Sequence, residues 1–190
     1  LTTNQISEAE YLLDLTSKQY QAAVWLSDWD LLQYEIPTSI HTSNAFRFVQ
    51  RYVLAVFYLS LDGPKWQNQL HFLDKTDECA WFQPRSISDG SVVAVGVTCN
   101  EVEEVETLLM PRNLLKGTLP TELALLTKLD FIDLNRNDIS GTIPSQFAAL
   151  SRLDFFDLRY NLLSGDLPSW IGESWYRELV LLGLSDNEFE

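Results

Sequence analysis

Apolar and polar positions in the second half of the chain recur with a fixed period. Residues 117–140 and 141–164 both open with Gly-Thr-[Leu/Ile]-Pro and both contain Leu-x-x-apolar-x-Leu-x-x-Asn before a closing Ser. The same pattern fits residues 105–116 upstream and residues 165–190 downstream. A sequence that repeats with a period of about 20 to 50 residues is typical of stacked-repeat proteins. The repeat therefore predicts a solenoid in which each copy forms one turn.

Each copy predicts one short strand and one return segment. Ile132 and Leu134 alternate with polar neighbours, as a strand with one buried face requires. A proline near the start of each copy fixes the backbone where a short helical turn begins, and in the first copy this turn buries Leu123, Leu126 and Leu129. Successive strands then stack in parallel, which makes the predicted fold class α/β. The prolines are Pro120, Pro144 and Pro168.

One asparagine per copy predicts a structural ladder. A chain that bends sharply after each strand leaves buried backbone groups without partners, and the asparagine side chain carries both a donor and an acceptor. We expect these side chains to satisfy the bends of successive turns. The ladder residues are Asn113, Asn137, Asn161 and Asn187.

A recurring glycine–proline motif resembles a known repeat family. Residues 115–120, 139–144 and 163–168 all read [Leu/Ile]-x-Gly-x-[Leu/Ile]-Pro. This motif is similar to the plant-type subclass of leucine-rich repeats, found in receptor-like and secreted proteins of plants and also in algae such as diatoms. The resemblance covers residues 62–190. It implies a right-handed solenoid with a parallel sheet on its concave side, preceded by a helical amino-terminal cap and used mostly for recognition.

Residues 1–42 are interpreted as a helical leader. Two segments, Ser7 to Leu15 and Ser17 to Leu26, have apolar residues at helical spacing, and residues 27–30 are expected to break the second helix. Trp25 and Trp29 are expected to pack against the helix that follows, and the alternative is that they are exposed anchors.

Residues 43–100 are expected to form the cap. A helix from Ala45 to about Leu61, capped by Ser43 or Asn44, is apolar around most of its circumference and is expected to close the first turn of the solenoid. Plant-type caps carry a Trp, a Cys, a second Trp and Gly-Val-x-Cys, and this chain matches them at residues 66, 79, 81 and 96–99. It departs from the family by having one cysteine where many members have two, and by an apparent inserted loop at residues 83–94.

The family resemblance implies a disulfide between Cys79 and Cys99. Two cysteines alone leave buried free thiols as an alternative. Because disulfides persist in oxidising compartments, this pairing predicts an extracellular location, either secreted or in an outward-facing ectodomain.

Residues 101–190 are interpreted as about four repeats, the last of them incomplete, with further repeats or another chain expected beyond the last turn. The acidic run at residues 101–106 suggests a calcium site, but its alternation favours a first strand with exposed Glu around buried Val.

Outward-facing strand residues are expected to line up in columns on the concave face. These columns combine aromatic, acidic, amide and basic side chains, a mixture suited to a protein, peptide or glycan ligand. The alternative is that they are solvated positions copied along with the repeat. The candidate ligand-binding residues are Phe131, Asp133, Asn135, Arg136, Phe155, Asp157, Arg159 and Tyr160.

Charge and motifs exclude several classes of function. The chain has 27 acidic and 13 basic residues and a net charge of -14, so it repels nucleic acid and anionic lipid. No apolar run is long enough to insert in a membrane. His41 and His71 lack metal-ligand spacing, and no catalytic or nucleotide-binding motif occurs. Asp133 and Asp157 on neighbouring strands could share a proton or bind calcium. Without a flanking cleft they predict no enzyme, so no catalytic residue, cofactor or metal is expected.

We therefore expect a non-catalytic recognition module, part of a receptor-like or secreted protein. The alternative is a structural subunit that assembles through its helical cap and open solenoid end. Further candidate partners are a second copy of the chain and a co-receptor.

Overall fold

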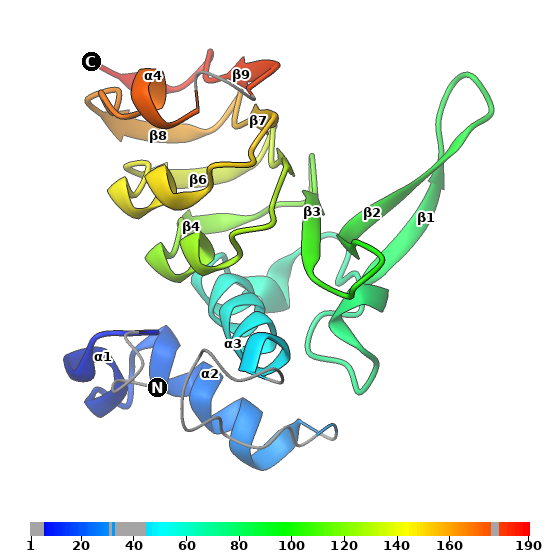
Figure 1. Cartoon of the computed structure of the whole chain (residues 1–190), viewed down its shortest axis with the longest axis vertical. Helices are drawn as coiled ribbons and strands as arrows, with labels where there is room; N and C mark the ends of the chain where they lie inside the picture. The colour runs from blue at the N-terminus through cyan, green and yellow to red at the C-terminus, as the bar shows by residue number, and fades with distance from the viewer. Residues whose placement is uncertain (1–5, 31, 33–44, 176–178) are drawn as a thin grey trace.

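The computed structural model describes residues 6–30, 32, 45–175 and 179–190. Figure 1 shows amino-terminal helices at one end, repeat turns stacked above them, and a long hairpin that projects sideways from the first turn. The architecture is an α/β solenoid with a helical cap, as the sequence predicts.

Two sheets run along the solenoid. The larger has the order β1-β2-β3-β5-β7-β9; β1, β2 and β3 are antiparallel neighbours, whereas β3, β5, β7 and β9 are parallel. Its strands are Phe82–Ser86, Val92–Cys99, Val105–Leu109, Phe131–Asp133, Phe155–Asp157 and Leu181–Gly183. The smaller sheet is parallel and consists of β4 (Lys116–Thr118), β6 (Asp138–Gly141), β8 (Leu162–Gly165) and β10 (Glu188–Phe189).

Short helical turns return the chain from one sheet to the other. They are η4 (Thr121–Leu125), η5 (Ser145–Ala149) and α4 (Ile171–Ser174). Pro120 and Pro144 stand at the N-cap positions of η4 and η5 in extended conformation, where their missing N–H costs no hydrogen bond. Leu123 and Leu129 are fully buried, as predicted.

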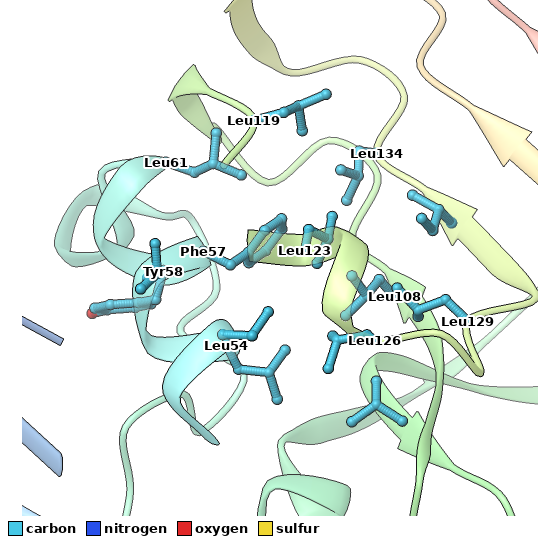
Figure 2. Close-up of a cluster of buried hydrophobic side chains, with 14 of the residues drawn as sticks. Leu54, Phe57, Tyr58, Leu61, Leu108, Leu119, Leu123, Leu126, Leu129 and Leu134 are labelled. Atoms are coloured by element: carbon cyan, nitrogen blue, oxygen red, sulfur yellow. The ribbon is translucent and has the colours of Figure 1, made fainter. Parts of the chain in front are cut away.

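The long helix of the cap closes the first turn. Helix α3 (Ala45–Ser60) buries Leu54 and Phe57 completely, and Figure 2 shows these side chains facing Leu123 and Leu126 of the first return segment. Gly117 has φ +133°, and an added Cβ there would lie 2.1 Å from the carbonyl oxygen of Ser60. Only glycine therefore lets β4 approach the end of α3 this closely.

The asparagine ladder joins successive turns. The Asn137 side chain accepts from the backbone N–H of Asn113 (2.9 Å) and Leu115 (3.1 Å), and donates to the carbonyls of Met110 (3.0 Å) and Leu134 (2.9 Å). Asn161 one turn later, and Asn187 one turn after that, each accept from one such N–H group and donate to the two corresponding carbonyls. At the first rung, the Asn113 side chain bonds the backbone of Asn68 in the cap.

The amino-terminal segment forms α1 (Ala9–Leu13), α2 (Lys18–Val24) and a π-helical turn, η1 (Trp25–Trp29). The expected break at residues 27–30 is therefore wrong, because helical turns continue to Trp29 and the chain turns away at Asp30. Trp25 packs edge-on against Trp81, with ring centroids 6.2 Å apart. Trp29 is 73% exposed, so its expected packing is also wrong. The proposed N-caps Ser43 and Asn44 lie outside the described residues.

A buried arginine joins the leader to the cap. The Arg51 guanidinium is fully buried; it donates to both carboxylate oxygens of Asp30 at 2.6 Å and to Glu78 at 3.1 Å. It also lies over the rings of Trp25 and Trp81, 5.3 Å and 5.0 Å from their centroids. The two carboxylates, which are themselves buried, belong to separate segments that Arg51 holds together.

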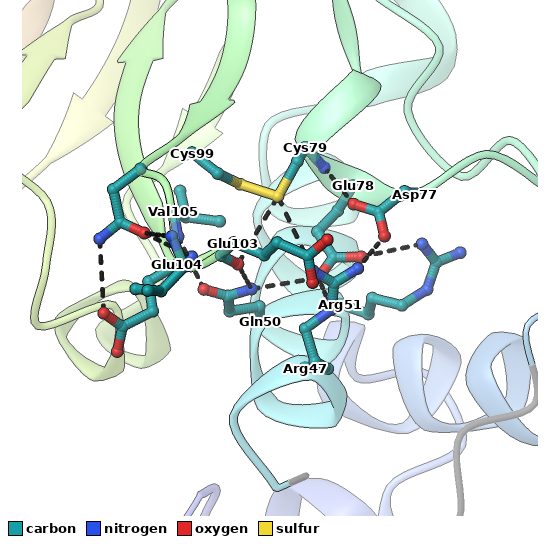
Figure 3. Close-up of a disulfide and its surroundings, with 12 residues drawn as sticks. Arg47, Gln50, Arg51, Asp77, Glu78, Cys79, Cys99, Glu103, Glu104 and Val105 are labelled. Atoms are coloured by element: carbon teal, nitrogen blue, oxygen red, sulfur yellow. Dashed lines mark hydrogen bonds and ion pairs between the residues drawn. A yellow bond between two sulfur atoms is a disulfide. The ribbon is translucent and has the colours of Figure 1, made fainter. Parts of the chain in front are cut away.

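The structure confirms the predicted disulfide between Cys79 and Cys99 (Figure 3). Beside it, the acidic run does not form the expected strand: β3 begins only at Val105, and Val102 is 65% exposed. The cause is a turn around Asn100, whose side chain accepts from the backbone N–H groups of Val102 and Glu104 at 3.0 Å.

The apparent inserted loop at residues 83–94 is an antiparallel hairpin. Strands β1 and β2 pair from Phe82↔Gly96 to Ser86↔Val92, and Gly90 has φ +85° in the connecting turn. The run of valines from Val92 onward favours a strand, which the loop interpretation overlooked.

Candidate functional site

Strand register brings the predicted columns together. Phe131 pairs with Phe155 and Asp133 with Asp157, on the neighbouring strands β5 and β7. The column of Phe131 continues to Thr107 on one side and Leu181 on the other.

The two phenylalanines form a stacked pair. Their ring centroids are 4.1 Å apart and their planes differ by 7°. Both side chains are half-buried, so the pair leaves an apolar ridge open on the outer surface of the sheet.

The sequence predicts an outward-facing Asp157, but its side chain is buried beneath Arg159. It is 1% exposed, and its carboxylate accepts from the Arg159 Nε at 2.9 Å and from a terminal nitrogen at 2.6 Å. These contacts raise the pKa of the Arg159 guanidinium, chiefly through the hydrogen bond to Asp157. The adjacent residue in register is Gly183, where an added Cβ would lie 2.6 Å from Asp157 Oδ1. Glycine thus leaves room for an ion pair that fixes Arg159 in place.

Asp133 is held by its own partner. Its Oδ1 accepts from the Asn135 backbone N–H (3.1 Å) and side-chain amide (2.6 Å). Burial raises its pKa above 3.8, the bonds to Asn135 oppose this, and the charge of Asp157 adds a smaller increase. Because Asp157 is engaged with Arg159, the hypothesis of a shared proton or calcium ion has no free second carboxylate. Within residues 6–30, 32, 45–175 and 179–190, no three His, Cys, Asp or Glu side chains group to hold a metal.

Arg136 and Tyr160 occupy corresponding corners of successive turns. The guanidinium of Arg136 lies 4.1 Å from the centroid of the Tyr160 ring. Both residues have left-handed backbone, with φ +56° and +57°, and each directly precedes a ladder asparagine. This conformation costs residues other than glycine about 1–2 kcal/mol.

Sequence reasoning missed an acidic column beside the phenylalanines. Glu106, Asp130 and Asp154 directly precede the outward residues of β3, β5 and β7. Burial raises the pKa of Asp130 to about 6, and the charges of Glu106 and Asp154 add to the effect. The 24-residue spacing of Asp130 and Asp154 could have revealed the column.

The described part of the chain has no helix with the length and apolar character needed to cross a bilayer. The Leucine Rich Repeat family model matches residues 128–150 and 152–174. Residues 128–174 therefore contain leucine-rich repeats. No curated protein sequence matches it.

Solved structures share this leucine-rich-repeat fold. The ectodomain of the receptor kinase SOBIR1 from Arabidopsis thaliana is 23% identical, with a TM-score of 0.50 over 72% of this chain and 66% of that one. A plant ice-binding protein is 20% identical, with a TM-score of 0.51 over 75% of this chain and 49% of that one. PEPR1 in its structure with AtPEP1 is 32% identical over 50% of this chain, but the match has a TM-score of 0.47 and spans 13% of that chain. The present chain therefore spans only part of the length of each of these three proteins.

Proposed function

We propose that this leucine-rich-repeat domain is a non-catalytic recognition module. It binds a peptide or protein segment on the outward face of β3, β5, β7 and β9. The observation that carries the proposal is the rigid presentation of mixed side chains on this face. Arg159 is anchored by buried Asp157 yet its side chain is 44% exposed. An arginine fixed before binding loses less entropy when a ligand arrives.

The composition of the face supports the same function. The stacked Phe131 and Phe155 offer apolar contact area, while Arg136 and Arg159 offer donors in fixed positions. Aromatic and arginine side chains dominate the energetics of protein interfaces.

The proposed location is extracellular. The Cys79–Cys99 disulfide supports it, since such bridges persist in oxidising compartments. Secreted proteins and receptor ectodomains both fit this setting.

The test exchanges face residues for those that other repeats carry in the same columns. A face variant combines Phe131→Thr and Phe155→Thr, as in Thr107, with Arg136→Asp and Tyr160→Asp, as in Asp186. A control variant changes two exposed residues of the η5 return segment, Gln146→Ala and Arg152→Gln. All three proteins are used in pull-downs from the extracellular fraction of the source. We expect the wild type and the control to retain a partner that the face variant loses. An equal catch from all three would contradict the proposal.

Assembly is the second candidate, favoured by apolar side chains on the last described turn. Val180 is 85% exposed and Leu167 is 54% exposed. Sedimentation velocity over a range of concentrations tests it, since association abolished by Val180→Lys and Leu167→Lys would support assembly at this end. A monomer at every concentration would contradict it.

A further inference from the structure

The β1–β2 hairpin forms a cavity with the first repeat strand. The cavity has a volume of about 450 Å³ and is lined by Arg85, Ser86, Ile87, Ser88, Val93, Val95, Leu109 and Pro111. Leu109 is paired in register with Gly96, whereas Val93 and Val95 alternate with Gly96 along β2 and share the side of buried Val97. The valine side of the cavity is therefore separate from the column that runs from Leu109 to Asp133.

A partner is expected to contact the side chains of the hairpin, because the free edge of β1 disfavours pairing with another strand. Backbone hydrogen bonds from Ile87 to Ser91 and from Val97 to Trp81 fix which residues of β1 point toward β2. Antiparallel pairs alternate, so Phe82, Pro84 and Ser86 turn their backbone groups outward. Pro84, in the middle, has no N–H to donate, which discourages pairing with another strand.

The β1–β2 hairpin carries few charged side chains. Between Phe82 and Cys99 the only charged residues are Arg85 and Asp89, in a chain with a net charge of -14. Asp89 accepts from the backbone N–H of Ser91 in the turn. Among the residues that the structure describes, no carboxylate lies within ion-pair distance of Arg85.

Arg85 stands beside the apolar part of the cavity. It is paired in register with Val93, and Val95 follows two positions later on the same face. An apolar side chain can pack on Val93 and Val95, and a carboxylate two residues along an extended segment can then meet the guanidinium on the same side.

We propose that this cavity binds an extended segment of a partner protein in which a large apolar side chain lies close to an Asp or Glu. The inference rests on the proposed recognition function and extends it to the ligand's chemistry. It assigns the hairpin, an insertion in the repeat framework, a binding site of its own beside the recognition face. Local complementarity to Arg85 selects the acidic side chain even though the chain as a whole is acidic.

The experiment uses a phage-displayed library of random linear peptides selected on the whole chain, followed by titration of synthetic copies of the enriched sequences. We expect them to carry Asp or Glu within two positions of a large apolar residue. Arg85→Met keeps the aliphatic stem and removes the charge, so it should weaken binding by about tenfold, as loss of a charge-assisted hydrogen bond does. Arg152→Met, an exposed arginine beyond η5, is the matched control and should change nothing. Unchanged melting temperatures establish that the variants are folded.

A charge exchange makes the test specific. Arg85→Glu should lose the acidic peptide and regain binding to a copy with Lys in place of the acidic residue. Peptides that bind Arg85→Met as well as the wild type but fail on the face variant would overturn the cavity proposal and leave the recognition face standing. Absence of any enriched peptide would overturn both.

Discussion

Replacing Arg51 with methionine should destabilise the fold far more than a typical substitution. Arg51 is fully buried, and its partners Asp30 and Glu78 are 2% and 0% exposed. Methionine fills much of the space but leaves buried Asp30 without its cation and leaves Glu78 with only Arg47, at 3.4 Å. Removing one partner of a buried ion pair costs about 3–5 kcal/mol. Domains of this size are stable by about 5–15 kcal/mol, so the loss is a large share of the total.

Urea unfolding followed by tryptophan fluorescence measures this loss, because Trp25 and Trp81 both lie next to the guanidinium. A second variant adds Asp30→Asn and Glu78→Gln to Arg51→Met. It removes the uncompensated charge, and we expect it to recover about half or more of the lost stability.

Two further variants bracket the effect. Arg51→Lys keeps the charge but loses the fork that spans both oxygens of Asp30, so its loss should be intermediate. Lys65→Met breaks an ion pair whose lysine side chain is 79% exposed and should cost less than about 1 kcal/mol. If Arg51→Met cost no more than Lys65→Met, or if the triple variant were as unstable as the single one, the reasoning from buried charge would be refuted.

Three other outcomes follow from the structure. Asn137→Ala leaves three backbone groups without partners, because the Leu134 carbonyl keeps its bond from Asn161, and it should cost about 3 kcal/mol or more in the same urea assay. Asn187→Ala on the partly exposed last rung should cost less, and equal losses would contradict the ladder argument. Opening the Cys79–Cys99 bridge, which spans 20 residues of sequence, should cost about 3 kcal/mol, seen as a lower urea midpoint in reductant; an unchanged midpoint would contradict it. The pKa of Asp130 is raised to about 6 from 3.8, so its folded state binds the proton more tightly, and the resulting stability is present below pH 3.8 and lost as the pH rises through 6. Asp130→Asn should therefore stabilise the chain at pH 7, by about 1 kcal/mol after allowing for solvent screening, and should flatten the dependence of urea midpoints on pH; a less stable variant at pH 7 would contradict this.

The repeat was predictable because its period carries redundant information. Each of residues 113, 137, 161 and 187 repeats the same hydrogen-bonding task, so one pattern fixed the sheet register and the columns of the face. The sequence could not show that Asp157 is buried under Arg159, because this depends on the space left by Gly183 in the next turn. Nor could it show the role of Arg51, whose partners Asp30 and Glu78 lie 21 and 27 positions away.

Local sequence patterns gave a wrong prediction where a side chain bound backbone groups that a strand would have used. Residues 101–106 alternate as a strand does, yet the Asn100 side chain draws two backbone donors into a turn. Glu103 is then free to pair with Arg47 at 3.0 Å, a contact that no periodic pattern encodes. The acidic column at Asp130 was overlooked because a single carboxylate before a strand is ordinary, and only stacking of the turns makes it a column.

The ladder gives the solenoid a direction of dependence. Asn137 completes the backbone of the turn that contains Asn113, and Asn161 in turn bonds Ile139 and Leu134 of the turn before it. Each turn thus relies on a side chain supplied by its successor. Damage to one repeat should therefore loosen the preceding repeat, toward the cap, more than the following one.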